Sequence, residues 1–198
     1  GPGQLTRGCA VVAVAQDRSS YNIYYYGGFD GLDEGNFNDD VWILSLPSFM
    51  WMKVASGTKG HARAGHKCVT PYPDQMMVIG GQSADLLGGP RCVEGNEIVQ
   101  LFNLTNGKWL DSYDPANYGD YGVPEMIHLM IGGGYAGGAT MTTPTPTGWD
   151  NNSLASVFET LYPTSKIVTH YPYAPAASNG TRPTVNDEDG GGLASWVA

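Results

Sequence analysis

Short apolar runs bounded by turn residues, rather than long amphipathic stretches, mark most of this chain. Three of the runs end in paired glycines, at 24–28, 77–81 and 129–133. The first glycine of each pair recurs after 53 and then 52 residues. Such near-equal spacing indicates an internal repeat, and runs of this length are typical of β-strands.

Other landmarks recur in phase with the first two glycine pairs. Arg7 and Arg63, 56 residues apart, each precede an apolar strand, and Trp51 and Trp109, 58 residues apart, each close a unit. Apolar segments follow the glycines at 40–44 and 97–102. Each unit therefore predicts four short strands separated by turns, the pattern of one blade of a β-propeller.

These units resemble kelch repeats, whose signature is an apolar strand ending in Gly-Gly, then a spaced aromatic or aliphatic strand, then Trp. The resemblance covers roughly residues 7–112. It implies structural roles for Gly27, Gly28, Trp51, Arg63, Gly80, Gly81, Trp109, Gly132 and Gly133. The glycines are expected to allow sharp turns and close backbone approach. The two tryptophans are expected to pack between adjacent blades.

The third unit departs from this pattern, since no later strands follow its glycines. Leu154, Val157, Phe158 and Leu161 have helical spacing instead, and Asn151–Ser153 offer caps. This ending resembles the close of the kelch ectodomain in cell-surface proteins of filamentous fungi. In that family a Ser/Thr/Pro-rich stalk and usually one membrane span follow. No run in this chain reaches the roughly 18–20 apolar residues that a span needs.

The predicted fold class is all-β, with two kelch-type propeller blades, a partial third, a short C-terminal helix and an extended tail. The expected segments are a cleavage scar and linker at 1–6, blades at 7–56 and 57–122, a divergent terminal unit with the helix at 123–173, and a Pro/Ser/Gly/acidic tail or stalk at 174–198.

Two and a half blades cannot close a ring, because propellers have about four to eight blades. Three explanations stay open. The chain is the C-terminal piece of a longer propeller whose other blades come from elsewhere, or its copies assemble into a ring, or it persists as an open stack.

Composition narrows the protein class. The chain has 28 glycines and 13 prolines, too many for a helical bundle, while 41% hydrophobic and 11% aromatic residues argue against disorder. The net charge is −9 and cations are not clustered, so we expect no nucleic-acid partner.

Three N-glycosylation sequons, at Asn103, Asn151 and Asn179, favour an extracellular or cell-surface location. Cys68 and Cys92 lie in one repeat and are candidates for a disulfide, which leaves Cys9 unpaired or with its partner in an absent upstream segment. The alternative is a cytosolic propeller with three buried thiols.

No catalytic motif is evident: the four histidines are scattered and lack zinc-ligand spacing. His66 is expected to be structural. The favoured function is a non-enzymatic extracellular binding or adhesion scaffold without a cofactor, whose protein or carbohydrate ligand is unknown. The alternative is part of an extracellular copper oxidase of the galactose-oxidase type, although no converging Tyr/His set can be identified.

Overall fold

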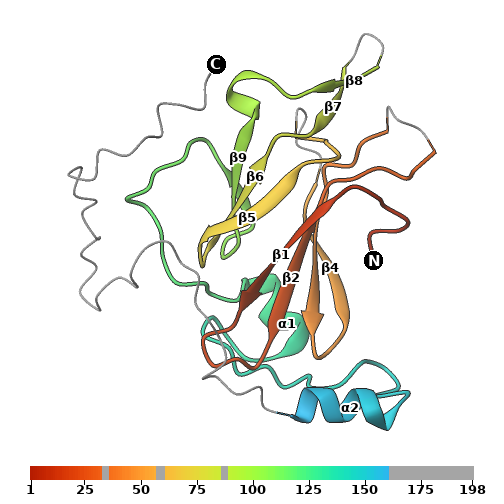
Figure 1. Cartoon of the computed structure of the whole chain (residues 1–198). Coiled ribbons are helices and arrows are strands. Elements are labelled where there is room, and N and C mark those ends of the chain that lie inside the picture. The colour runs from red at the N-terminus through yellow and green to blue at the C-terminus, as the bar shows by residue number, and fades with distance from the viewer. Residues whose placement is uncertain (33–35, 57–60, 86–88, 161–198) are drawn as a thin grey trace. The chain divides into compact units, whose positions relative to one another are not determined.

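The computed structural model describes residues 1–32, 36–56, 61–85 and 89–160. These residues form two four-stranded antiparallel sheets, a separate hairpin and short helices (Figure 1). The expected tail at 174–198 and the sequon at Asn179 lie outside the described residues. The all-β prediction is confirmed.

The first sheet is a simple up-and-down arrangement in chain order. Its strands are β1 (Cys9–Val14), β2 (Tyr21–Tyr26), β3 (Val41–Leu46) and β4 (Met50–Ala55). Burial alternates along them: Tyr24 and Tyr26 are buried in β2, and Val41 and Ile43 in β3. This period of two places one face of the sheet in the core.

The second sheet repeats this arrangement. Its strands, from one edge to the other, are β5 (Lys67–Tyr72), β6 (Gln75–Ile79), β9 (Val99–Asn103) and β10 (Lys108–Leu110). The repeat pattern did not predict the insertion between β6 and β9. It consists of the hairpin β7 (Gln82–Asp85) and β8 (Gly89–Cys92), followed by a 3₁₀ helix, η1 (Gly95–Glu97).

Strand register aligns the two sheets residue by residue. Cys9 pairs with Tyr26 in the first sheet as Lys67 pairs with Ile79 in the second. The two tryptophans also hold equivalent positions, since Trp51 pairs with Leu44 in the first sheet and Trp109 pairs with Phe102 in the second. The two sheets are therefore repeats of one unit.

The same register corrects the alignment of the two arginines. Isolated bridges join Thr6 to Phe29 and Ala64 to Gln82, so Thr6 corresponds to Ala64. Arg7 then corresponds to Gly65, and both have positive φ angles, 58° and 73°. At the same offset of 58 residues, Arg63 corresponds to Leu5, so Arg63 has no arginine counterpart in the first unit.

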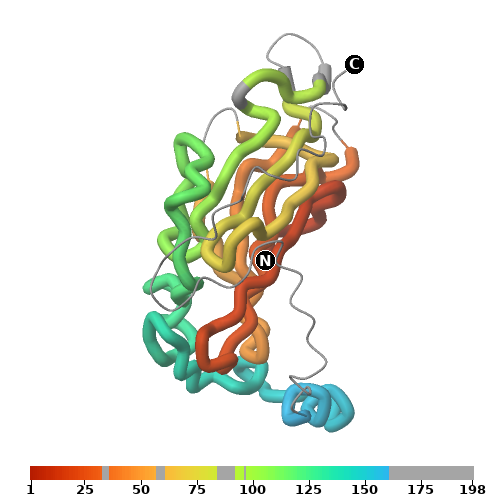
Figure 2. Tube along the Cα trace, turned by 60° about the vertical axis from the view of Figure 1, so that its left-hand side comes forward, coloured from red at the N-terminus to blue at the C-terminus, as the bar shows by residue number. Residues whose placement is uncertain are grey.

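The core lies between the sheets. Buried residues of the first sheet pack against Met76, Val78 and Phe102 of the second sheet. Figure 2 follows the chain from the red strands of the first sheet to the yellow and green strands of the second. Beyond β10, Tyr121 and Val123 join the same core, and the Tyr121 hydroxyl lies 3.0 Å from that of Tyr24.

The third apolar run is a helix, which corrects the expected third glycine-ended strand. Helix α1 (Glu125–Ile131) begins after Pro124 and ends at Gly132, whose φ is 85°. Ile127 and Ile131, four residues apart, are both buried in the core. Leu129, midway between them, is 72% exposed, whereas in a strand it would share the face of Ile127 and Ile131, so the burial follows the period of a helix.

The predicted C-terminal helix is present as α2 (Asn152–Glu159), and Asn151 caps it by accepting a hydrogen bond from the Ser153 backbone. None of its residues is buried. Phe158 packs instead against Trp149 and Phe49. No helix in the described part of the chain is long and apolar enough to cross a membrane.

Candidate functional site

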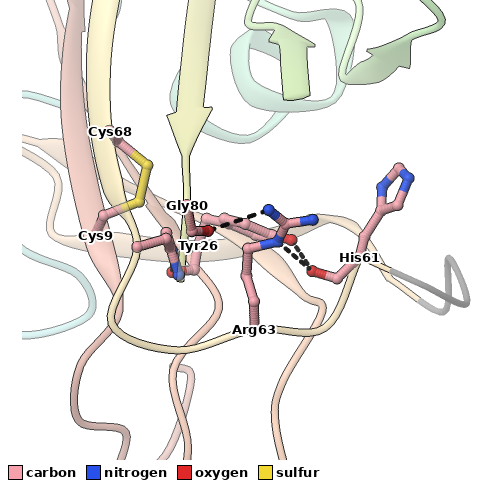
Figure 3. Close-up of a disulfide and its surroundings, with 7 residues drawn as sticks. Cys9, Tyr26, His61, Arg63, Cys68 and Gly80 are labelled. Atoms are coloured by element: carbon pink, nitrogen blue, oxygen red, sulfur yellow. Dashed lines mark hydrogen bonds between the residues drawn. A yellow bond between two sulfur atoms is a disulfide. The ribbon is translucent and has the colours of Figure 1, made fainter. Parts of the chain in front are cut away.

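Arg63 is a buried cation at the junction of the two sheets. Its guanidinium donates to the carbonyls of His61 and Gly80 at 3.3 and 3.2 Å (Figure 3), and to the carbonyl of Glu97 at 2.8 Å. The Tyr26 hydroxyl of the first sheet donates to the same His61 carbonyl. Arg63 thus joins the end of β6, the segment before β9 and the segment before β5 through backbone acceptors alone.

His66 lies just before β5 and is almost fully buried. Its Nε2 lies 3.2 Å from the Tyr26 carbonyl, and its ring packs against the Tyr26 ring. Burial lowers the pKa of His66 to about 4, and Arg63 and Lys67 add to this effect, while the hydrogen bond to Tyr26 opposes it. The imidazole is therefore neutral at pH 7.

The glycine pairs leave space for these contacts. A Cβ on Gly27 would lie 2.6 Å from both the Arg63 carbonyl and His66 Cε1. A Cβ on Gly81 would lie 3.0 Å from the Ala64 carbonyl. In the third pair, a side chain on Gly133 would collide with the Gly137 carbonyl. The first two pairs therefore support the junction between the sheets, whereas the third shapes the turn after α1.

The cysteines pair differently from the sequence expectation. Cys9 of β1 and Cys68 of β5 form a disulfide across the two sheets, with Cα atoms 5.6 Å apart (Figure 3). Cys92, the expected partner of Cys68, is a free and exposed thiol on β8. The prediction used proximity within one repeat, but the stacking of β5 on β1 brings Cys9 closer.

The tryptophans occupy matching positions in different surroundings. The Trp109 ring lies between the sheets, 4.9 Å from the Tyr26 ring and 5.1 Å from the Phe102 ring. Trp51, its counterpart in the first sheet, is 40% exposed. The other side chains on the same face as Trp51 form what we call the outer face. Together with Trp51, this face comprises Ala10, Val12, Val14, Tyr21, Ile23, Tyr25, Trp42, Leu44, Leu46 and Lys53.

Two of the three sequons lie at turns. Asn103 ends β9, and its side chain accepts hydrogen bonds from the Thr105 and Asn106 backbones. Asn151 is exposed at the start of α2. Both asparagines therefore have a local structural role, and the exposure of Asn151 makes it the more accessible acceptor.

Sequence reasoning missed the contacts that tie the turn between β1 and β2 to the chain after α1. Asp17 accepts a hydrogen bond from the Gly138 backbone at 2.6 Å, and Ser19 accepts one from Ala139 at 3.0 Å. Hydrogen bonds from Ser19 and Gly138 lower the pKa of Asp17. No local sequence signal predicts these contacts, because about 120 residues separate the partners.

Comparison with known proteins points to one class. Over 156 residues the chain is 33% identical to a kelch repeat-containing protein of Arthroderma benhamiae. The aligned region is 69% of this chain but 23% of that relative, so the chain spans less than a quarter of its length. No family model matches the chain. The similarity supports a kelch-like family.

Proposed function

We propose that this chain is the C-terminal part of a kelch propeller that acts as a non-enzymatic binding or adhesion scaffold at the cell surface or outside the cell. The observation that carries the proposal is the repeated, same-direction stacking of the two sheets. It is supported by the similarity to a kelch repeat-containing protein.

The stacking is directional, because different faces of the two sheets meet. The first sheet contributes the side of Tyr24 and Tyr26, and the second contributes the side of Met76 and Val78. By register, Tyr25 of the first sheet corresponds to Val78 of the second. The outer face of the first sheet is therefore the counterpart of the face that is buried in the second.

The apolar side chains of the outer face are more exposed than those of the stacked face of the second sheet, which supports a further blade packing against the outer face. Val78 is fully buried, whereas Val12 is 52% exposed. Burying apolar surface stabilises by roughly 25 cal/mol per Å², so this largely apolar face favours a covering sheet. We assign that position to a preceding blade of the same type, supplied by a longer chain or by a second copy.

Surface loops on rigid strands would carry recognition, as is usual for scaffolds of this kind. The ligand class, protein or carbohydrate, is not assigned. The extracellular location rests on the sequons and on the cross-sheet disulfide, since such bonds persist in oxidising compartments.

Sedimentation of the purified chain over a concentration series tests the scaffold proposal. With the outer face uncovered, we expect concentration-dependent association and binding of an apolar fluorescent dye. The substitution Val12→Lys should reduce both, and Leu129→Lys on the exposed side of α1 is the matched control. A wild-type chain that stays monomeric and binds no dye would contradict the proposal.

Secretion from a eukaryotic host tests the location. We expect a mass decrease at Asn151 after removal of N-glycans, and Asn151→Gln should abolish the decrease at that site. A secreted chain without glycan on any of its three sequons would remove the main support for an extracellular role.

A further inference from the structure

Cys9, His66 and Cys68 form a compact cluster of soft donor atoms. The two sulfurs and one ring nitrogen of His66, Nδ1 or Nε2, lie within 4.8 Å of one another. The residues come from β1, from the segment before β5, and from β5, so the cluster bridges the two sheets. For a metal bound by two sulfurs at about 2.3 Å, tetrahedral or trigonal geometry places the sulfurs roughly 4 Å apart. The cluster is within reach of such an arrangement.

His66 has a free donor atom inside the protein. Since a carbonyl only accepts hydrogen bonds, the contact with Tyr26 places the proton on Nε2 and a lone pair on Nδ1. Nδ1 is buried and has no hydrogen-bond partner among the described residues. An unmet buried acceptor costs about 1–3 kcal/mol, so this atom is the feature that a structural role for His66 leaves unexplained.

The donor set selects the kind of ion. Thiolate sulfur favours Cu(I), zinc and iron–sulfur clusters. Structural zinc sites almost always have four protein ligands, whereas this cluster offers three among the residues that the structure describes. Cu(I) accepts three ligands. Two thiolates, a neutral imidazole and Cu(I) carry a net charge of −1, which the positive charges of Arg63 and Lys67 near His66 favour.

We propose that Cys9, His66 and Cys68 form a three-coordinate Cu(I) site once the disulfide between the cysteines is reduced. A dithiol reductant supplies two electrons and two protons, the S–S bond breaks, and the reductant becomes a disulfide. Cu(I) then displaces both thiol protons and binds two thiolates and Nδ1. The two sheets stay linked at this point in both states, by a disulfide or by the metal.

Anaerobic titration tests the site. The chain is reduced with a water-soluble phosphine, which takes up the oxygen of water to become a phosphine oxide while the disulfide gains two protons and two electrons. After removal of the phosphine, Cu(I) is added in competition with a chromogenic chelator. We expect one equivalent of tightly bound Cu(I), and X-ray absorption should show two sulfur ligands and one nitrogen ligand.

Variants separate this site from adventitious binding. His66→Ala and Cys9→Ser should each weaken Cu(I) binding at least tenfold, whereas Cys92→Ser and His128→Ala should not. The X-ray absorption measurement on the wild type remains decisive if a variant fails to fold. Absence of competitive binding, loss of binding in Cys92→Ser, or a spectrum without a nitrogen ligand would each overturn the proposal.

Discussion

A single arginine, Arg63, fixes the junction through three backbone carbonyls that belong to separate segments. The planar guanidinium spans these acceptors, whereas a lysine ammonium is a point charge on a flexible stem. We expect Arg63→Lys to lower the free energy of unfolding by about 2–3 kcal/mol, because buried carbonyls lose their donors. Chemical denaturation measures this loss.

Arg7 provides the matched control for that experiment. Its exposed side chain donates a 3.3 Å hydrogen bond to the Gln82 side chain and lies over the Phe29 ring, 5.8 Å from its centroid. Arg7→Lys should therefore cost less than about 0.5 kcal/mol. Equal losses in the free energy of unfolding for the two variants would show that the buried hydrogen bonds of Arg63 contribute no more to stability than the exposed one of Arg7.

Asp74, in the turn between β5 and β6, has a carboxylate whose ionised form destabilises the folded state. Its Oδ1 is buried and has no hydrogen-bond partner among the described residues. Burial raises the pKa of Asp74, the neighbouring Asp120 adds to the rise, and the Gly119 backbone opposes it. The folded state therefore holds this proton to higher pH than the unfolded state, so ionisation at neutral pH works against folding.

The Asp74→Asn substitution removes that ionisation. We expect the variant to be as stable as the wild type or up to about 1 kcal/mol more stable at pH 7. The difference should shrink as the pH falls through the carboxylate range, because wild-type Asp74 then becomes neutral. Urea titrations at several pH values measure it, with Asp150→Asn on the surface as the control for lost charge. A difference that grows on acidification would contradict the assignment.

At the scale of elements, Gly27 and Gly80 end equivalent strands with the same backbone geometry. Their φ angles are 67° and 66°. A Cβ on Gly27 would meet the Arg63 carbonyl and the His66 ring, whereas a Cβ on Gly80 would meet nothing within 4 Å. The pair therefore separates the cost of backbone strain from the cost of crowding.

Alanine at each position measures the two costs. Gly80→Ala should destabilise by about 1–2 kcal/mol, the cost of an L-residue in the left-handed region. Gly27→Ala should lose a further 1–3 kcal/mol, approximately, because the junction must move. Thermal or chemical unfolding of both variants tests this order, and equal losses would mean that the junction accommodates the added methyl group.

Regular strand elements were predictable from sequence because alternation and glycine pairs recur with little change in both sheets. The third apolar run was not predicted correctly: it ends in Gly-Gly like the two strands, but it forms helix α1, in which Ile127 and Ile131 are buried. The β7–β8 hairpin was also missed, because it has no counterpart in the first unit.

The cluster of Cys9, His66 and Cys68 was not predicted from local sequence patterns, for a different reason. Cys9 and Cys68 are 59 residues apart and become neighbours because β1 and β5 are the first strands of stacked sheets. Aligning the units by their tryptophans places Cys9 opposite Lys67, the residue next to Cys68. That alignment was the available signal, whereas proximity within one repeat favoured Cys92.

At the scale of the whole molecule, both ends of the two-sheet stack carry exposed apolar residues. The outer face of the first sheet includes Val12, and the far side of the second sheet includes Ile79 and Val99, each 40% exposed. Part of that far side is covered, since Gln75 donates to the Asn117 carbonyl at 2.7 Å. The two ends are different surfaces, so contacts between copies are expected to be head-to-tail.

Mixing two blocked variants distinguishes head-to-tail from head-to-head association. Val12→Lys blocks one end and Val99→Lys the other, so each variant alone should lose the association expected of the wild type. An equimolar mixture retains one compatible pair of ends, the outer face of the Val99→Lys chain and the far side of the Val12→Lys chain. Native mass spectrometry should therefore detect a one-to-one dimer that goes no further. Association of Val99→Lys alone, with none in Val12→Lys, would indicate a symmetric contact through the outer face and would rule out directional stacking between copies.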